Sequence, residues 1–331
     1  MCVVWGRQCA TEFCSGPTRP IPHRSVCVMN SIPLISVIIT TYQSERTILR
    51  LVDSILGQKG RGTLFALEIL AFDDGSSDQT VALLAERGIA AVVNTTNSGG
   101  PNWGRNCGLR QAKGDWISIA DHDDEWVVDR LEALLQFADG VPIVSSGFIL
   151  RNASLGQDQV RSCTQGVRDF APNVAFIQRL LRQKNGQNMY IGGLLLRSDR
   201  AHVHFEEVHG QLDFDWLLRV TEGCATREVC RPLFIRHVEG SNLSLNSTYR
   251  DRDFEFAMHT LSELAARYPS EVKVSRARWH GSYGRYWYTV GEFAKARHHF
   301  LRSDWSLAVI FYFATTFVGG NWIRKRVQIF G

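Results

Sequence analysis

DWISIADHDDEWVVD, at residues 115–129, changes its pattern twice over a short length of chain. Residues 116–120 are an apolar run, which is typical of a short buried strand. Four polar residues, 121–124, end this run abruptly. An apolar periodicity of the helical kind then runs through Val127, Leu131, Leu134 and Leu135. The stretch therefore predicts a strand, a polar turn and a helix, in the order found in α/β sheets.

The polar turn, Asp121-His122-Asp123-Asp124, holds three carboxylates and an imidazole. At the carboxyl end of a strand these groups lie where open α/β sheets bind their ligands. Clustered like charges repel, so the turn needs either open solvent or a bound cation. A hard divalent metal that holds a diphosphate suits the whole quartet. For Asp124 alone we favour capping of the next helix, and in that alternative the other side chains are solvated.

The chain before this stretch repeats the same alternation. Strands are predicted at 34–39, 68–72 and 89–93, separated by amphipathic helices. Polar clusters follow the first strand at 40–43, the second at 73–78, and the fourth at the quartet described above. Parallel strands end at one edge of a sheet, so the clusters are expected to share one site. We predict an α/β fold with a doubly wound, mostly parallel sheet.

Composition divides the chain into three segments. Residues 1–31 contain prolines and cysteines without periodicity, so we expect a disordered N-terminal tail, with translation starting at Met1 or Met29. Residues 32–250 form the predicted α/β domain, and residues 251–331 a helical C-terminal extension. Further strands are expected at 141–150, 189–196 and 226–238, and helices around 174–181, from 213, and at 251–268.

Charge and cysteine usage exclude several classes of protein. The formal net charge of +4 is too small to indicate nucleic acid, and no basic stripe with interleaved aromatic residues precedes residue 270. The eight cysteines include no CxxC pair, so a zinc ribbon has no support. We interpret the last four, Cys107, Cys163, Cys224 and Cys230, as reduced core thiols. With no secretory signal in the sequence, a reducing cytoplasm is the expected compartment.

The C-terminal segment is apolar and then basic. Residues 305–323 carry no charged side chain and precede Arg324-Lys325-Arg326. The strictly apolar core, 307–318, is short for a membrane span. We favour peripheral contact of residues 302–326 with the membrane interface, at the inner face of the cell membrane. Burial against protein ranks second and a true span third.

Four segments together resemble the family 2 glycosyltransferases in order and spacing. They are ISVIITTYQSERTILRLVDSILGQ at 35–58, FDDGSSD at 72–78, NSGGPNWGRNCG at 97–108 and DWISIADHDDEWVVDRL at 115–131. Each motif alone is weak, but four in register at strand ends are specific, and the resemblance covers roughly residues 33–245. It implies a GT-A fold, a divalent metal (Mn²⁺ or Mg²⁺), inversion at the anomeric carbon and a nucleotide-diphosphate sugar donor. UDP-sugars are favoured, with GDP- and dTDP-sugars left open.

The resemblance also implies roles for residues on the donor side. Thr40 and Tyr42 match positions that hold the base and ribose, and Asp74 matches the carboxylate that accepts a hydrogen bond from the base. Asp74 suits an Asx turn as well, and both roles can coexist. Arg105 matches the arginine that faces the base and diphosphate, although by itself it would be read as a solvated helix residue.

Metal binding is implied for two further positions. Asp121 and Asp123 match the DxD signature, so we assign Asp123 to the metal and Asp121 to ribose or metal-bound water. His122 fills the unspecified middle position and is expected to contact solvent. His237 resembles a histidine that reaches the metal or diphosphate, and the alternative is a buried histidine with its hydrogen bonds satisfied.

The acceptor side is matched through two short elements. Gly192 and Gly193 resemble glycines near the acceptor, although glycines often end strands. Asp213 and Asp215 match an E-D-x-D element in which Leu212 replaces the glutamate. We assign Asp213 to the general base and Asp215 to the acceptor site. In the alternative, Asp213 is only a helix N-cap.

The resemblance therefore implies an inverting glycosyltransferase, and we expect it to act on a glycan or lipid-linked acceptor in surface polysaccharide or glycan synthesis. A sugar-nucleotide pyrophosphorylase would need a glycine-rich loop after the first strand, and a NAD enzyme would need GxGxxG there. Residues 40–44 contain no glycine. The alternative that stays open is a non-catalytic nucleotide-sugar-binding or scaffolding module of the same fold, as Leu212 and the helical tail allow.

Overall fold

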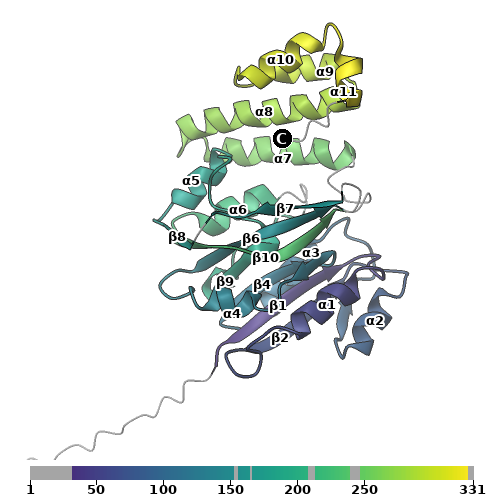
Figure 1. Cartoon of the computed structure of the whole chain (residues 1–331), viewed down its shortest axis with the longest axis vertical. Helices are drawn as coiled ribbons and strands as arrows, with labels where there is room; N and C mark the ends of the chain where they lie inside the picture. The colour runs from purple at the N-terminus through teal and green to yellow at the C-terminus, as the bar shows by residue number, and fades with distance from the viewer. Residues whose placement is uncertain (1–31, 153–155, 165, 208–212, 239–246, 327–331) are drawn as a thin grey trace, which may run out of the picture. The chain divides into compact units, whose positions relative to one another are not determined.

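The computed structural model describes residues 32–331, apart from 153–155, 165, 208–212, 239–246 and 327–331 (Figure 1). Residues Ile32–Gly331 form one compact unit. The predictions for residues 1–31, including a start at Met29, fall outside the described residues. The same holds for Leu212.

The first half of the unit alternates strands and helices as the sequence predicts. Its elements are β1 (Leu34–Thr41), α1 (Ile48–Leu56), β2 (Ala66–Asp73), α2 (Thr80–Glu86), β3 (Ala91–Val93), α3 (Asn102–Gln111), β4 (Trp116–Asp121), β5 (Asp124–Trp126) and α4 (Arg130–Leu135). Strand β1 pairs in parallel with β2 on one side and β4 on the other, and β2 pairs in parallel with β3. The doubly wound pattern is therefore confirmed in this half.

The second half completes the sheet with strands of both directions. Its elements are β6 (Ile143–Asn152), β7 (Gln157–Arg161), β8 (Val167–Phe170), α5 (Val174–Leu180), β9 (Leu194–Arg197), α6 (Asp213–Thr221) and β10 (Thr226–Val238). The ten-stranded sheet has the order β3-β2-β1-β4-β9-β6-β10-β5, with β7 beside β6 and β8 beside β10. Strand β9 is antiparallel to both β4 and β6, so the sheet as a whole is mixed.

The polar quartet corrects one local prediction. Asp124 does not cap a helix, because it begins β5, which pairs antiparallel with β10 opposite Arg236. Helix α4 begins later, at Arg130, with Asp129 as its N-cap residue. Pairing with a strand more than a hundred residues away in sequence overrides the local helical periodicity, which had placed Val127 in the helix.

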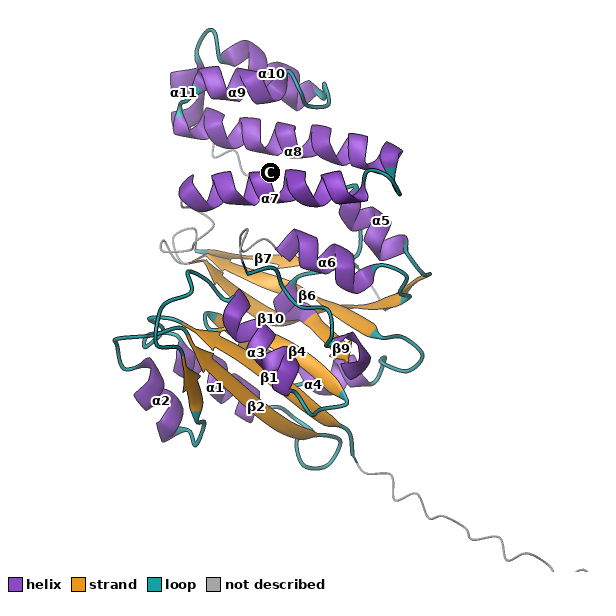
Figure 2. Cartoon of the chain, turned by 180° about the vertical axis from the view of Figure 1, so that it is seen from behind, coloured by secondary structure: helices purple, strands orange, loops and turns teal. Residues whose placement is uncertain are grey.

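Helices cover both faces of the sheet. The buried side chains of β1 alternate between the two sides, with Ile35, Val37 and Ile39 in one apolar cluster and Ile38 in the other. Helices α1 and α4 pack over the first cluster, and α3 and α6 over the second (Figure 2). Burial on both faces explains why the strand is a continuous apolar run.

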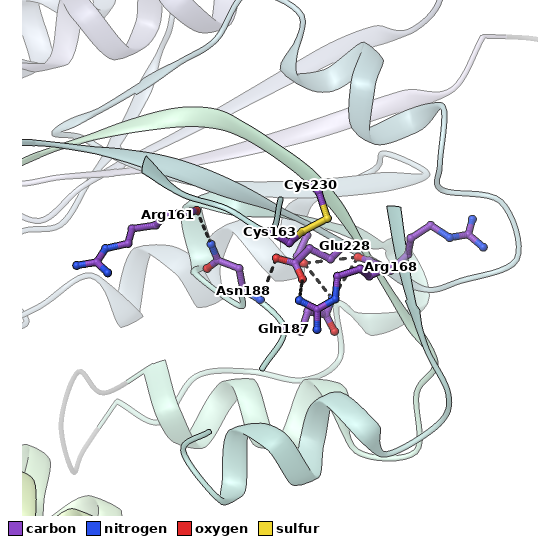
Figure 3. The surroundings of a disulfide bond; sticks show 9 residues. Arg161, Cys163, Arg168, Gln187, Asn188, Glu228 and Cys230 are labelled. Carbon is purple, nitrogen blue, oxygen red and sulfur yellow. Dashed lines mark hydrogen bonds and ion pairs between the residues drawn. A yellow bond between two sulfur atoms is a disulfide. The ribbon is translucent and has the colours of Figure 1, made fainter. Parts of the chain in front are cut away.

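A disulfide corrects the interpretation of the cysteines. Cys163, which follows β7, is bonded to Cys230 on β10, with their Cα atoms 4.8 Å apart (Figure 3). Both strands flank β6, which brings together two residues 67 positions apart in sequence. The prediction of reduced thiols is therefore wrong for this pair, whereas Cys107 and Cys224 are free. The cysteine argument for a reducing compartment loses its support.

The C-terminal extension is helical, as predicted. It comprises α7 (Ser247–Leu264), α8 (Pro269–Val290), α9 (Phe293–Phe300), α10 (Leu307–Thr315) and α11 (Gly320–Arg326). Phe176 on α5 and Phe214 on α6 share an apolar cluster with Ala257 and Leu261 on α7. The helices stack outward from this contact (Figure 1). Across the described residues, every helix is too short or too polar to cross a membrane.

Candidate active site

The carboxyl ends of β1, β2 and β4 meet at one edge of the sheet, as predicted. In the strand register Thr40 lies opposite Asp121, and Thr41 lies opposite Asp73. The Thr41 hydroxyl donates to Asp73 Oδ1 at 2.8 Å, and the backbone N–H of Ser76 donates to Asp73 Oδ2 at 2.7 Å. Asp73, a residue to which the sequence assigned no role, thus fixes the turn that follows β2.

Asp74 is held by the loop that follows β3. Its carboxylate accepts from Asn94 Nδ2 at 2.9 Å and from the backbone N–H and the hydroxyl of Ser98. These donors lie 20 and 24 positions along the chain, so the bonds of the Asp74 carboxylate are not those of an Asx turn, and the local turn bond to Ser76 is made by Asp73 instead. The Asp74 carboxylate is buried at the predicted donor side. Tyr42, by contrast, is 47 % exposed just beyond the end of β1, so its ring is free of the core.

Arg105 on α3 joins two acidic side chains from different elements. Its Nη2 lies 2.8 Å from Asp121 Oδ1 at the end of β4, and its Nη1 lies 3.1 Å from Asp213 Oδ1 at the start of α6. The guanidinium also lies 5.1 Å from the centre of the Phe205 ring. Because Arg105 is almost fully buried, these contacts fix its position. The structure therefore brings together three of the residues predicted for the site.

The two carboxylates on Arg105 have opposite protonation preferences. The ion pair with Arg105 outweighs burial and holds the pKa of Asp121 below its ordinary value. Burial raises the pKa of Asp213 above its ordinary value, in spite of Arg105, and the charge of Asp121 raises it further. Asp213 keeps 32 % of its side chain exposed, so it remains open to a ligand. A partly open carboxylate with a raised pKa suits a proton acceptor.

Comparison with known proteins decides the family. The family model described as glycosyl transferase family 2 matches residues 36–204, just over half of this 331-residue chain. The chain belongs to glycosyltransferase family 2. The matched segment contains most of β1, the acidic edge and Arg105, and it ends before Asp213.

Curated relatives match about a third of this family 2 glycosyltransferase. The succinoglycan biosynthesis protein ExoO of Rhizobium meliloti is 33 % identical over 113 residues, which cover 34 % of this chain and 31 % of ExoO. The β-1,3-glucosyltransferase WfaP of Escherichia coli, which acts on α-D-GlcNAc-diphosphoundecaprenol, is 32 % identical over 108 residues. That match covers 32 % of this chain and 41 % of WfaP. The chain thus spans less than half of the length of these relatives.

Solved structures extend the likeness over most of the chain. Staphylococcus aureus TarS (residues 1–349) with UDP-GlcNAc superposes with a TM-score of 0.62 at 17 % identity, covering 90 % of this chain and 93 % of that one. The mannosyltransferase PcManGT of Pyrobaculum calidifontis, in complex with GDP-Man and Mn²⁺, gives a TM-score of 0.55 at 17 % identity. That match covers 89 % and 81 % of the two chains. The GT-A fold expected from the sequence is thereby confirmed.

The acidic turn of this family 2 glycosyltransferase fits a divalent cation. Burial raises the pKa of Asp123, with Asp121 adding to the rise. Burial, followed by the charges of Asp121 and Asp123, holds the pKa of Asp124 well above its ordinary value. Asp124 Oδ2 is buried and lacks a hydrogen-bond partner among the described residues. No three acidic, histidine or cysteine side chains form a complete cage within the described ranges. Mg²⁺ needs no such cage, because it is usually bound by one or two carboxylates together with substrate phosphates.

Gly192 and Gly193 lie against this turn for reasons of packing. A Cβ atom on Gly192 would lie 2.6 Å from Asp124 Oδ2, so only glycine leaves that carboxylate in place. The Gly192 carbonyl accepts from Arg130 Nη2 at 2.6 Å, and a Cβ atom on Gly193 would lie 3.0 Å from the Phe234 ring. Gly192 thus borders the acidic turn and Gly193 borders Phe234, and a role of either glycine in acceptor binding stays a prediction.

Two predicted residues face other partners. Asp215 is buried against α7, with Oδ2 accepting from Arg219 and Oδ1 from Thr260 Oγ1 at 3.2 Å. Both oxygens are engaged, so the predicted acceptor contact of Asp215 has no support in this geometry. His237 Nε2 lies 3.1 Å from Glu125 Oε2. A metal-binding role for His237 stays a prediction.

Arg236 is a residue that sequence reasoning passed over. It lies opposite Asp124 in the β10–β5 register, and its charge lowers the pKa of Asp121, Asp123 and Asp124 against the rise caused by burial. A cation beside the acidic turn is well placed to contact a diphosphate. Its position directly before His237 is the sequence signal that could have identified it.

Proposed function

We propose that this family 2 enzyme is an inverting, metal-dependent glycosyltransferase. It moves a sugar from a nucleotide-diphosphate donor, with UDP-sugars favoured, to a hydroxyl of a glycan or lipid-linked acceptor in surface polysaccharide or glycan synthesis. The observation that carries the proposal is the bridge from Arg105 to both Asp121 and Asp213. It joins the proposed donor edge and the proposed base across one buried guanidinium.

Asp213 is the general base in this proposal. As the acceptor hydroxyl attacks the anomeric carbon, its proton passes to a carboxylate oxygen of Asp213. Oδ1 bonds to Arg105, which fixes the carboxylate while part of it stays exposed. A positioned base contributes about 10²–10⁴-fold in rate. One base without a covalent enzyme intermediate gives a single displacement and therefore inversion.

The donor edge binds the nucleotide and the leaving diphosphate. Thr40, Tyr42 and Asp74 hold the base and ribose, while Arg105 and Asp121 lie between them and the reacting sugar. Asp123, with His237 as a second candidate, would hold Mn²⁺ or Mg²⁺, which supplies Lewis-acid neutralisation of the diphosphate when bound. Arg236 adds a permanent positive charge at the same turn. A protonated side chain on the leaving group is then unnecessary.

Similar proteins support the substrate classes. TarS was solved with UDP-GlcNAc and PcManGT with GDP-Man and Mn²⁺. The names of WfaP and of the Campylobacter jejuni β-1,3-glucosyltransferase specify acceptors linked to undecaprenol through a diphosphate. These names favour a lipid-linked acceptor, and with it a place at the inner face of the cell membrane.

The C-terminal helices supply a surface for that membrane contact. Leu307, Phe317 and Val318, on and after α10, are 87 %, 64 % and 81 % exposed, and Trp305 and Trp322 flank them with exposed indoles. Exposed apolar and tryptophan side chains at one end of a basic segment are typical of helices that lie in a membrane interface.

Donor turnover tests the proposal against the non-catalytic alternative. A thermal-shift panel of UDP-, GDP- and dTDP-sugars with Mn²⁺ identifies the donor by the largest increase in Tm. Hydrolysis of that donor in the absence of acceptor is then measured as the release of nucleotide. An enzyme releases nucleotide slowly in this assay, whereas a scaffolding or binding module releases none, and that result would refute the catalytic assignment.

A further inference from the structure

A pocket of about 400 Å³ is lined by residues of α5, the first turn of α6, α7 and α8, and of the segment after α5. Figure 2 shows how these four helices are arranged. Three arginines line the pocket, Arg179, Arg182 and Arg250, together with five aromatic side chains. Among the described residues its one acidic side chain is Asp253. The lining therefore combines an excess of positive charge with flat apolar surfaces. This combination suits a ligand in which an anionic group is attached to a ring or polyol.

Buried donors in this lining lack protein partners. Arg179 Nε and Trp279 Nε1 are both buried, and neither has a hydrogen-bond partner among the described residues. Buried polar groups in folded proteins are normally satisfied, and such exceptions require an explanation. The oxygen atoms of a bound anion would accept hydrogen bonds from both of these N–H groups.

Arg182 follows the last turn of α5 and lines the pocket. Its left-handed φ of 50° belongs to the end of the helix, where the backbone N–H of Gln183 donates to the Gln178 carbonyl at 2.9 Å. Its guanidinium lies 4.0 Å from the centre of the Trp279 ring, and Nη1 donates to the Arg278 carbonyl at 3.3 Å. Burial, followed by the charge of Arg179, lowers the pKa of Arg182 to about 9, as expected for cations gathered without enough anions.

The pocket adjoins the proposed base. Phe214, which lines the pocket, directly follows Asp213 on α6. Arg179 and Asp253, which also line it, both interact electrostatically with Asp213. A molecule bound here would therefore lie beside residues that border the proposed base.

We propose that this pocket is the acceptor subsite and that it binds a phosphate group of the acceptor. Arg179 and Arg182 take the phosphate oxygens, and the aromatic side chains pack against the attached sugar or polyol. The inference rests on the proposed function, because it specifies the acceptor as a phosphorylated sugar or polyol. It adds a binding site whose arginines come from α5, the segment just after it and α7, outside the donor edge.

Calorimetry on the full chain tests the subsite. The protein is first saturated with UDP and Mn²⁺, so that the donor edge is occupied, and is then titrated with glucose 6-phosphate, glucose or inorganic phosphate. We expect glucose 6-phosphate to bind at least about 10-fold more tightly than either other probe, because only it engages both parts of the lining. Equal affinity for glucose and glucose 6-phosphate would overturn the proposal. Equal affinity for inorganic phosphate would also overturn it, by indicating a general anion site.

Matched variants assign the binding to the pocket. Arg179→Gln is expected to weaken glucose 6-phosphate binding about 10-fold or more, because it removes a charge-assisted contact. Trp279→Phe serves where the arginine variant fails to fold, and a smaller loss is expected from its missing N–H. The control is Arg267→Gln, outside the pocket, where Arg267 pairs with Glu222. Unchanged affinity in Arg179→Gln, or an equal loss in the control, would refute the subsite.

Failure of the proposed function gives a different result. If the wild type binds glucose 6-phosphate through Arg179 but releases no nucleotide from any donor, the subsite stands and the transferase assignment falls. If the donor is hydrolysed and glucose 6-phosphate does not bind, the transferase assignment stands and the subsite is refuted.

Discussion

The sheet edge is rich in acidic side chains, whereas the pocket beside α5 is rich in arginines. At the edge, Asp121 and Asp213 both pair with one buried arginine, Arg105, whereas the described lining of the pocket has three arginines and one acid, Asp253. Asp213 lies at the boundary and interacts with both. Under the two proposals, the acidic edge binds a cation and the basic pocket binds an anion. Each prediction below alters one side of this comparison.

Asp213→Asn carries the largest expected effect. The amide cannot accept the acceptor proton, so kcat is expected to fall about 10²–10⁴-fold while UDP-sugar binding is retained. Nucleotide release in the presence of acceptor measures the rate, and calorimetry measures the binding. Asp215→Asn is the matched control on the same helix turn. It is expected to lower the free energy of unfolding by about 1–3 kcal/mol through its bonds to Arg219 and Thr260, and to keep turnover. Wild-type turnover in Asp213→Asn would remove the base assignment.

Asp123→Ala tests the cation at the acidic edge. The affinity for UDP-sugar in Mn²⁺ is expected to fall about 10–100-fold, and the difference between titrations with Mn²⁺ and with EDTA is expected to disappear. His237→Ala serves as a comparison, with a loss expected only if the imidazole leaves Glu125 for the metal. If Asp123→Ala binds UDP-sugar with wild-type affinity and with the same dependence on Mn²⁺, the cation is bound elsewhere.

Membrane contact is expected to depend on the exposed end of the helical extension. Leu307→Ser removes an apolar side chain that is 87 % exposed and is expected to weaken partition into anionic vesicles by about 10-fold. Vesicle sedimentation measures the partition. Val160→Ser is the control, because Val160 is an exposed apolar residue on β7, far along the chain from α10. The interfacial proposal fails if both variants sediment like the wild type.

The pH dependence of turnover is the smallest expected effect. Asp213 must be ionised to act as a base, so kcat falls as the pH falls through its raised pKa, which lies above 3.8. Arg105 lowers that pKa, so Arg105→Gln is expected to move the acid limb of the profile to higher pH. If the acid limb does not move in this variant, Arg105 does not influence the pKa of the base.

Sequence patterns predicted the parts of the fold that depend on local periodicity. Strand β10 was predicted at residues 226–238 and has those bounds, and Arg105, Asp121 and Asp213 were selected from three separate segments that the structure brings together. Long-range pairing explains what was missed. Asp124 was assigned to a helix because its partner strand is distant, and the Cys163–Cys230 bond spans 67 positions with no recognisable spacing. The pocket escaped detection because its arginines and aromatic residues come from separate helices.

The close approach of Gly192 to Asp124 limits how this protein can change over evolution. Any larger residue at position 192 would displace the carboxylate, and the Gly192 carbonyl also anchors Arg130, whose guanidinium lies 3.9 Å from the centre of the Trp126 ring. Positions 124, 126, 130 and 192 therefore form a unit whose members are expected to vary together among homologues. A homologue with alanine at 192 should carry a shorter or uncharged side chain at 124.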